Sequence, residues 1–300
     1  AGQHSIDMVQ YVLHIIPTNI VDAAARQDML QIIFFACFFG VAVAHIGEKG
    51  TLIVNFCQSV AEAMFKVTNY VMHFAPLGVF AMIAYTVGSY GITMLIPLGK
   101  LILSVAGATA LFIAVVATIA SVFTKINFFH LILALKDILF LAFSTASSEA
   151  ALPGAMKRLH RLGVPEATVT FVMPTGYSFN LDGSTLYSSA GILFIAQLYG
   201  IAMPIEQQLL VMVTLMLSTK GIAGVPGAGI IVVAATAAAF NLPTEGVAIL
   251  LGIDRILDMI RTICNVCGNC MATVVVSCWE KELNKDKFNR LYKEFREEKL

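Results

Sequence analysis

The segment from Gly252 to Val276, GIDRILDMIRTICNVCGNCMATVVV, constrains the fold more than any other, because it is long enough to cross a membrane yet carries charged residues. Five of its polar residues fall within about 80° of one another on a helical wheel. They are Asp254, Asp258, Arg261, Asn265 and Asn269, called the polar stripe below. A charged group near a bilayer centre costs roughly 2.5 to 3.5 kcal/mol. We therefore expect the polar stripe to face protein or a water-filled cavity and to serve a function.

The composition is typical of a multi-pass membrane protein. Of the 300 residues, 58% are hydrophobic and 13% are charged, whereas charged residues make up about 25% of a soluble domain. Thirteen of the 38 Asp, Glu, Lys and Arg residues lie between Glu280 and Lys299. We predict an all-α polytopic membrane protein that ends in a charged, solvated helix.

The cysteines and histidines leave one alternative open. All six cysteines lie in apolar segments, so no disulfide framework is expected. Cys264, Cys267 and Cys270 spell C-x-x-C-x-x-C, which is compatible with a membrane redox protein carrying an iron–sulfur cluster. The helical pattern favours packing roles for these small side chains. The six histidines show no metal-ligand spacing, so we expect neither an enzyme nor a cofactor. An anion channel is a further alternative.

Several uninterrupted apolar segments have the length of a membrane span. Met29 to His45 is just long enough, and Leu101 to Val122 has 22 residues without a charge. The longer segment from Leu52 to Val87 is interpreted as an interfacial entry followed by a span, because its charges lie in its first half.

Two pairs of shorter apolar arms enclose polar or glycine-rich tips. The first pair, 128–143 and 150–161, flanks the tip 144–149, and the second pair, 205–217 and 230–240, flanks the tip 218–229. Each arm is short for a full span, which is typical of a re-entrant hairpin whose tip lies at membrane depth. Ordinary surface loops are the alternative.

A helix with polar residues follows each pair of arms. After the first pair, the half-helices 164–179 and 184–199 flank Asn180, Leu181, Asp182 and Gly183, which predict an unwound centre. After the second pair, the helix expected over 246–279 carries the polar stripe. This repetition predicts interrupted helices around a transport site near the membrane midplane.

Basic residues indicate the orientation. With the C-terminus in the cytoplasm, the inner segments hold Lys49, Lys125, Lys136, Lys157, Arg158, Arg161 and seven tail residues, and the outer segments hold only Arg26 and Lys100. Basic residues favour the cytoplasmic side, so we expect a cytoplasmic C-terminus.

Four motifs occur in a specific order: STASSEAALP from Ser144, NLDGST from Asn180, AGVPGAG from Ala223 and DRILDMIRTICNVCGN from Asp254. In this order and spacing the chain resembles the dicarboxylate/amino acid:cation symporter family, the glutamate and aspartate transporters. The resemblance covers essentially the whole chain, from the family's fourth helix onward, and implies that three further helices would precede it. It also implies a glutamate-transporter-like fold with two re-entrant helical hairpins and interrupted transmembrane helices.

The resemblance implies an oligomeric assembly and a role for each part of the chain. Residues 1–92 would be mainly scaffold and trimerisation helices, 93–280 a transport domain, and 281–300 a charged cytoplasmic tail. The implied protein is a homotrimer in the cell membrane whose transport domains move in an elevator-like manner. Its partners would be an acidic amino acid, a coupling cation and the lipid bilayer, with no nucleic acid.

The resemblance also assigns the substrate-binding residues. Arg261 would hold the side-chain carboxylate of the substrate through two parallel hydrogen bonds, and Asp258 would take its amino group. Ser147 and Ser148 would bind the α-carboxylate near a helix N-terminus. The other implied contacts are Ser184, Val225, Gly227, Thr262 and Asn265. The alternative is an Asp258–Arg261 ion pair without any ligand.

The coupling ion depends on Asn269, because sodium-driven members have an Asp there and a hard cation prefers an anionic oxygen. The remaining positions implied for the coupling cation are Gly176, Ser178, Asn180, Asp182, Asn265 and backbone oxygens around Thr219, Lys220 and Ile222. Glu149, Asp182 and Asp258 are the candidate proton carriers. We therefore expect proton-coupled symport of L-glutamate and L-aspartate, as in bacterial proton/glutamate symporters. Sodium-coupled transport of these amino acids, or of C4-dicarboxylates, is the alternative.

Overall fold

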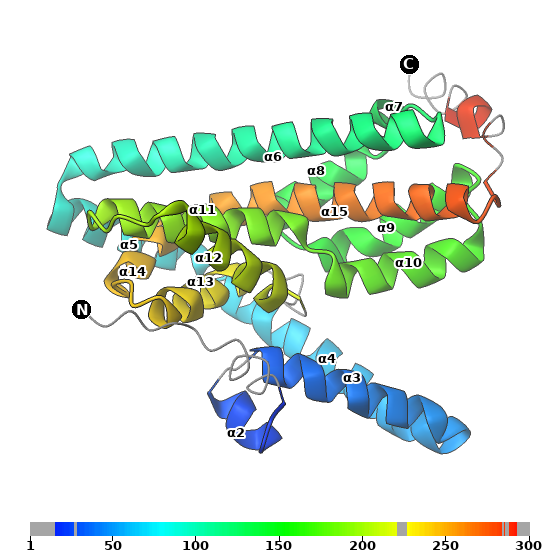
Figure 1. The fold of residues 1–300 in the computed structure, drawn as a ribbon, viewed down its shortest axis with the longest axis horizontal. Helices are drawn as coiled ribbons and strands as arrows, with labels where there is room; N and C mark the ends of the chain where they lie inside the picture. Colours follow the sequence, from blue (N-terminus) through cyan, green and yellow to red (C-terminus); the bar gives the residue numbers. More distant parts are fainter. Residues whose placement is uncertain (1–15, 27–28, 221–226, 284, 286–287, 293–300) are drawn as a thin grey trace. The chain divides into compact units, whose positions relative to one another are not determined.

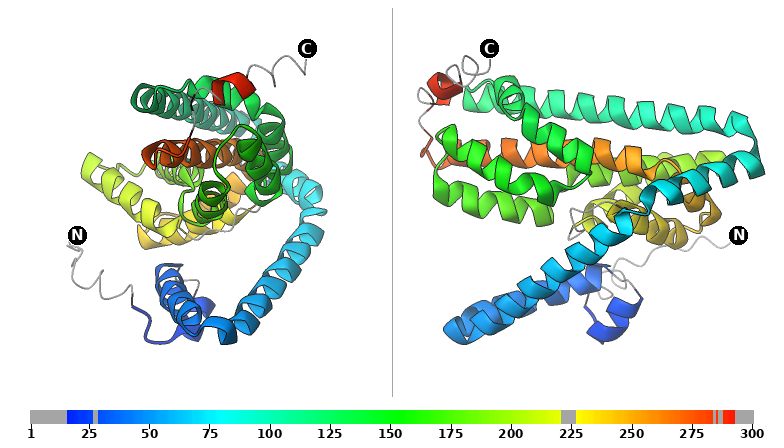
Figure 2. Two further views of the ribbon diagram at one scale, coloured as in Figure 1. Left: turned by 90° about the vertical axis from the view of Figure 1, so that its right-hand side faces the viewer. Right: turned by 180° about the vertical axis from the view of Figure 1, so that it is seen from behind.

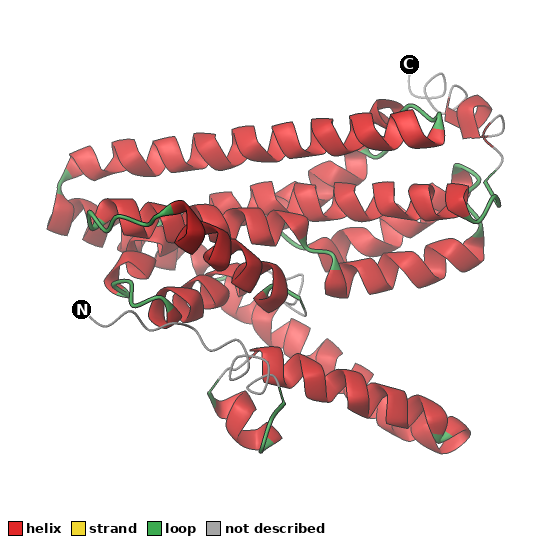
Figure 3. Cartoon of the chain, in the orientation of Figure 1, coloured by secondary structure: helices red, strands yellow, loops and turns green. Residues whose placement is uncertain are grey.

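The computed structural model describes residues 16–26, 29–220, 227–283, 285 and 288–292. All regular secondary structure within these ranges is helical (Figure 3). The chain divides into two compact units, Ala1–His73 and Phe74–Leu300. This boundary falls between two helices of the predicted 1–92 segment, and the assignment of that segment to a scaffold stays a prediction.

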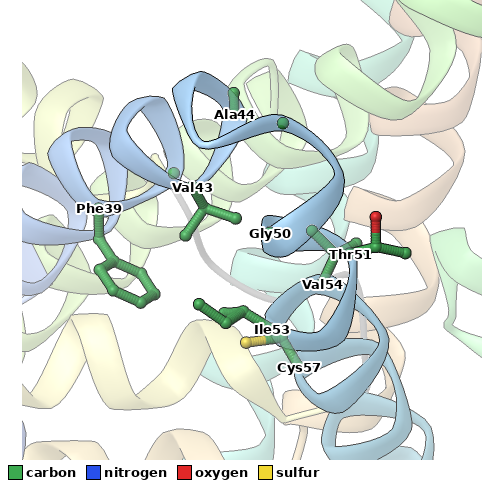
Figure 4. Close-up of a pocket in the computed structure, with 10 residues that line it drawn as sticks. Phe39, Val43, Ala44, Gly50, Thr51, Ile53, Val54 and Cys57 are labelled. Atoms are coloured by element: carbon green, nitrogen blue, oxygen red, sulfur yellow. The ribbon is translucent and has the colours of Figure 1, made fainter.

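The first unit contains a helical hairpin. It consists of α2 (Ile20–Ala25), α3 (Met29–His45), the short 3-10 helix η1 (Gly47–Gly50) and α4 (Thr51–Met72). Helix α3 has the bounds predicted from its apolar run. A groove of about 440 Å³ lies between α3 and α4 (Figure 4), and its ten lining residues include no charged side chain.

The second unit contains the remaining elements. They are α5 (Ala75–Tyr90), η2 (Ile92–Met94), α6 (Leu95–Thr124), α7 (Phe128–Ala134), α8 (Lys136–Thr145), α9 (Ser148–Arg161), α10 (Glu166–Phe179), α11 (Asp182–Leu198), α12 (Ile205–Ser218), α13 (Ala228–Ala239), α14 (Glu245–Leu251) and α15 (Asp254–Trp279).

Helix α15 runs through the middle of the second unit, alongside α6 (Figures 1 and 2). Its C-terminal half packs in an apolar core with α7, α8, α9 and α10, and its first turns pack in another with α11, α13 and α14. The two hairpin-like pairs, α8–α9 and α12–α13, thus belong to different cores, and both α6 and α15 contribute residues to each core.

Among the described residues, two helical segments are long and apolar enough to cross a membrane, Ile92–Thr124 and Asp254–Trp279. A third is possible if α7 and α8, which are bent by 62° at Leu135, form one broken span. The structure separates the arm predicted over 128–143 at this residue. Leu135 is fully buried, so packing against the core sets the bend where the sequence contains neither glycine nor proline.

The helix predicted over 246–279 is also two helices. Helix α14 ends at Leu251 and α15 begins at Asp254. A Cβ on Gly252 would lie 3.3 Å from Ile83 Cγ1 of α5, so glycine permits the close approach of α5 where the chain changes direction.

The charged C-terminal segment differs from a fully solvated helix. Leu283, Phe288 and Tyr292 are 1–7% exposed and belong to the core around α7 to α10. The Tyr292 ring stacks on His130 with 4.5 Å between the centroids. These apolar side chains anchor the segment because each removes hydrophobic surface from water.

Candidate functional site

The polar stripe is buried as the sequence predicts. The exposed fractions of its residues are 7% for Asp254, 1% for Asp258, 2% for Arg261, 2% for Asn265 and 1% for Asn269. Buried polar groups need hydrogen-bond partners, and buried charges need counter-charges. The partners of the stripe therefore define the candidate site.

Asp258 and Arg261 form the centre of this site. Arg261 Nε donates a hydrogen bond to Asp258 Oδ1 within one turn of α15. Arg261 Nη1 donates to Ser184 Oγ on α11 at 2.8 Å. The guanidinium is thereby oriented by two helices, and its planar fork suits it to hold a carboxylate.

The second carboxylate oxygen of Asp258 faces the start of α13. It accepts a hydrogen bond from the backbone N–H of Gly227. Gly227 is the last residue of the segment between α12 and α13. Gly227 has a φ of +79°, a conformation that favours glycine. Thr262 Oγ1 donates to the Asp258 backbone carbonyl at 2.7 Å. The structure thus brings Gly227, Ser184 and Thr262 together around the pair.

Asn265 holds the break between α10 and α11. Its Oδ1 accepts from the Gly183 N–H at 2.8 Å, and its Nδ2 donates to Ser184 Oγ at 3.3 Å. A Cβ on Gly183 would overlap the Arg261 carbonyl oxygen and lie 2.8 Å from Cys264 Cβ. Only glycine allows α11 to begin this close to α15.

Asn269 lies on α15 one turn after Asn265, beside the last turn of α10. Its Oδ1 accepts from Asn180 Nδ2 at 3.2 Å, and a Cβ on Gly176 would overlap the same oxygen. Asn269 Nδ2 is buried without a hydrogen-bond partner among the described residues. The structure therefore brings Asn269, Asn180 and Gly176 together.

The first tip is a tight turn between α8 and α9. Ala146 has a φ of +51°, and Ser147 caps α9 by accepting from the Ala150 N–H at 3.3 Å. Ser148 is 1% exposed, and Glu149 is half-buried in the first turn of α9. The uncapped N–H groups of this turn form a potential anion site.

A hydrogen bond joins the first tip to α15. Arg255 Nη2 donates to the Thr145 carbonyl oxygen at 3.2 Å. Arg255 Nη1 is buried and has no hydrogen-bond partner among the described residues. Arg255 is not among the predicted site residues, although its charge and its position next to the polar stripe are visible in the sequence.

Tyr187 is another buried contact residue that is not among the predicted site residues. It is fully buried in α11, and its hydroxyl donates to Asp254 Oδ1 at 2.6 Å. Asp254 begins α15 and thus has its partner 67 residues away. A tyrosine in an apolar helix is ordinarily a packing residue, so nothing local in the sequence identified this bond.

The remaining predicted positions are only partly described. Asp182 begins α11 and is half-buried, and Thr219 is fully buried just after α12. Val225 and Ile222 lie outside the described residues, as does the side chain of Ser178.

The three clustered cysteines lie along α15. Cys264, Cys267 and Cys270 are fully buried free thiols on α15. Within the described ranges, no group of three or more His, Cys, Asp or Glu side chains is arranged to hold a metal ion. Cys267 and Cys270 pack in the apolar core around α7 to α10, and the choice between packing residues and cluster ligands stays a prediction.

Comparisons with known proteins give relatives over most of the chain. The proton/sodium-glutamate symport protein of Geobacillus stearothermophilus is 51% identical over 280 residues, which are 93% of this chain and 66% of the relative. The proton/glutamate-aspartate symporter of Escherichia coli (strain K12) is 47% identical, over 92% of this chain and 63% of the relative. The C4-dicarboxylate transport protein of Bacillus subtilis (strain 168) is 40% identical, over 95% of this chain and 68% of the relative.

The chain spans about two thirds of the length of these curated relatives. The profile of the sodium:dicarboxylate symporter family matches residues 1–279. This range includes both hairpin-like pairs, the break before α11 and all of the buried polar stripe. The chain belongs to the sodium:dicarboxylate symporter family.

Proposed function

We propose that the protein is a secondary active symporter that imports L-glutamate and L-aspartate together with protons. The observation that carries this proposal is the buried Asp258–Arg261 pair, which meets Ser184 of α11 and Gly227 immediately before α13. A substrate with one ammonium and two carboxylates complements these groups. Removing one partner of a buried pair costs several kcal/mol, so a ligand must replace each contact that it breaks.

The proposed binding step is an exchange of partners. The substrate ammonium takes the place of Arg261 beside Asp258, and Arg261 turns its fork to the side-chain carboxylate. The α-carboxylate binds Ser147, Ser148 and the N–H groups at the start of α9. Asp258 favours an amino acid over a plain C4-dicarboxylate, because a dicarboxylate would leave this carboxylate without a counter-charge.

We assign the coupling ion as a proton. Asn269 supplies a neutral amide where a sodium site would gain from an anionic oxygen. The carboxyl groups of Glu149, Asp182 and Asp258 are the candidate carriers. The names of the relatives support both ions, since one is a proton/sodium-glutamate symport protein and another a proton/glutamate-aspartate symporter.

The proposed movement follows from the two hairpin-like pairs. We assign α8–α9 and α12–α13 as re-entrant hairpins that close over the substrate from opposite sides. Residues 93–280 form the moving transport domain, residues 1–92 the scaffold of a homotrimer, and the C-terminus lies in the cytoplasm.

Uptake of labelled glutamate by liposomes carrying the purified protein tests this function. We expect a pH gradient, inside alkaline, to drive uptake in sodium-free buffer, and unlabelled aspartate to compete better than succinate. Uptake that begins only when sodium is added would favour the sodium-coupled alternative. Stronger competition by succinate than by aspartate would favour a C4-dicarboxylate transporter, and the absence of uptake under either gradient would refute the symporter proposal.

A further inference from the structure

Two isolated charges of opposite sign lie at the start of α11 and in the second tip. Asp182 is the only Asp, Glu, Lys or Arg between Glu166 and Glu206, and Lys220 is the only one between Glu206 and Glu245. An ionisable side chain inside a membrane segment is costly and normally has a partner and a function. The proposed substrate site does not use the Lys220 side chain.

The fold brings together the two backbone segments that carry these charges. Asp182 is the first residue of α11, and Lys220 is the second residue after the end of α12. Thr185, one turn after Asp182, has its hydroxyl 2.8 Å from the hydroxyl of Thr219, which precedes Lys220. This contact holds the end of α12 against the first turn of α11, so the backbone that carries Lys220 lies close to the start of the helix that carries Asp182.

Within the part of the chain that the structure describes, the other groups near Asp182 are neutral or already paired. A Cβ on Gly268 of α15 would lie 3.1 Å from Asp182 Oδ2, so the α15 backbone passes close to this carboxylate. Asn180 and Asn269 contribute neutral amides nearby. Arg261 is already engaged by Asp258 and Ser184. A carboxylate in such surroundings needs a cation, either a bound ion or a protein side chain.

We propose that the Lys220 ammonium is the resident counter-ion of Asp182, and that this tethered cation makes a sodium ion unnecessary beside that carboxylate. The proposal deepens the proposed function, on which it rests, by naming a residue that sets the choice of coupling ion. A lysine ammonium is a compact charge with three donors on a flexible stem. It can therefore replace a small bound cation without changing the backbone around it.

The first experiment measures thermal unfolding of the purified protein in sodium chloride and in choline chloride, without substrate. Lys220→Met removes the charge but keeps the backbone carbonyl and most of the stem. We expect sodium to raise the Tm of this variant by about 5 °C, because an ion that binds only the folded state stabilises it. The wild type and Lys220→Arg should show no sodium effect. Lys100→Met, which removes a lysine from α6, is the matched control and should also show none.

The double variant Asp182→Asn/Lys220→Met removes both charges. It should unfold at a similar temperature in both salts, since no carboxylate is left to bind sodium. If Lys220→Met yields no folded protein in either salt, recovery of folded protein in the double variant supports the pair, and failure to recover overturns it. A Lys220→Met protein that folds with the same Tm in both salts also overturns the proposal.

The second experiment measures glutamate uptake into liposomes. Without sodium, Lys220→Met should lose at least tenfold in rate, and sodium should restore a substantial part of it. Sodium-independent uptake by this variant at the wild-type rate contradicts the proposal. The two inferences fail separately, because the sodium effect on Tm requires no transport, whereas the symporter proposal fails if the wild type takes up no glutamate under any gradient.

Discussion

Breaking the Asp258–Arg261 pair measures how much this buried ion pair contributes to the free energy of unfolding. Arg261→Met keeps much of the side-chain volume but leaves Asp258, which is 1% exposed, without its counter-charge. Loss of one partner of a buried pair costs about 3–5 kcal/mol. The variant also loses the 2.8 Å hydrogen bond to Ser184. The cost of losing this bond is partly included in the cost of breaking the pair. We expect the free energy of unfolding to fall by about 4 kcal/mol.

A double-mutant cycle separates the pair from its surroundings. Asp258→Asn alone leaves Arg261 uncompensated and should cost a similar amount. Asp258→Asn/Arg261→Met removes both charges and should lie within about 2 kcal/mol of the wild type, because a neutral pair carries no buried-charge penalty. Denaturant unfolding in one detergent gives all four values. Arg161→Met, which removes an exposed arginine at the end of α9, is the control and should change the free energy by less than about 0.5 kcal/mol.

Transport provides the functional half of this prediction. If Arg261 holds the side-chain carboxylate of the substrate, its loss removes about 3 kcal/mol of binding, more than a hundredfold in uptake at low glutamate. The double variant should recover stability but not uptake. A cost below about 1 kcal/mol for Arg261→Met would refute the structural argument, and retained glutamate transport would refute the assignment of Arg261 to the substrate.

Three further predictions concern the neighbours of this pair. Asn269→Asp places an anionic oxygen beside Asn180, so sodium should stimulate uptake while the glutamate KM changes less than about threefold. Gly183→Ala forces a Cβ into the α15 backbone and should cost about 2 kcal/mol of unfolding free energy, whereas Gly107→Ala in α6, with nothing within 4 Å, should be neutral or stabilising. Tyr187→Phe removes the 2.6 Å bond to Asp254 and should cost about 1–3 kcal/mol.

Each of these outcomes has a clear opposite. An Asn269→Asp protein that remains indifferent to sodium would show that the missing carboxylate does not set the ion. Equal stability of the Gly183→Ala and Gly107→Ala proteins would mean that the close approach of α11 to α15 is unimportant. A Tyr187→Phe protein as stable as the wild type would show that Asp254 is satisfied without the tyrosine hydroxyl.

The sequence predicted the burial of the polar stripe because helical periodicity is a local property. Residues 254, 258, 261, 265 and 269 share a face in any α-helix, and the cost of buried charge required that face to be covered. The helical arms followed from apolar runs in the same way, and α3 has the predicted bounds. The bend at Leu135 could not be predicted from the sequence, because leucine is an ordinary helix former and the bend is set by packing in the core.

Hydrogen-bond partners that are distant in the sequence could not be predicted from local sequence patterns either. The Tyr187–Asp254 and Arg255–Thr145 bonds join residues 67 and 110 positions apart. No spacing rule links such residues, and each side chain alone resembles a packing or interfacial residue. The family resemblance supplied Ser184 and Gly227, which lie within motifs. It assigned no role to Tyr187, which lies outside the motifs, or to Arg255, which lies within one of them.

The hydrogen bonds around Asn265 give a physical route between the substrate site and the proposed ion site. Arg261 donates to Ser184, Asn265 donates to the same hydroxyl, and Asn265 also accepts from the Gly183 N–H. Gly183 directly follows Asp182. A substrate that turns Arg261 away from Asp258 must therefore change the hydrogen bonds of the peptide segment that carries the Asp182 carboxylate. Linkage requires the reverse effect to be equal, so a change of charge at Asp182 alters the affinity of Arg261 for its ligand by the same factor.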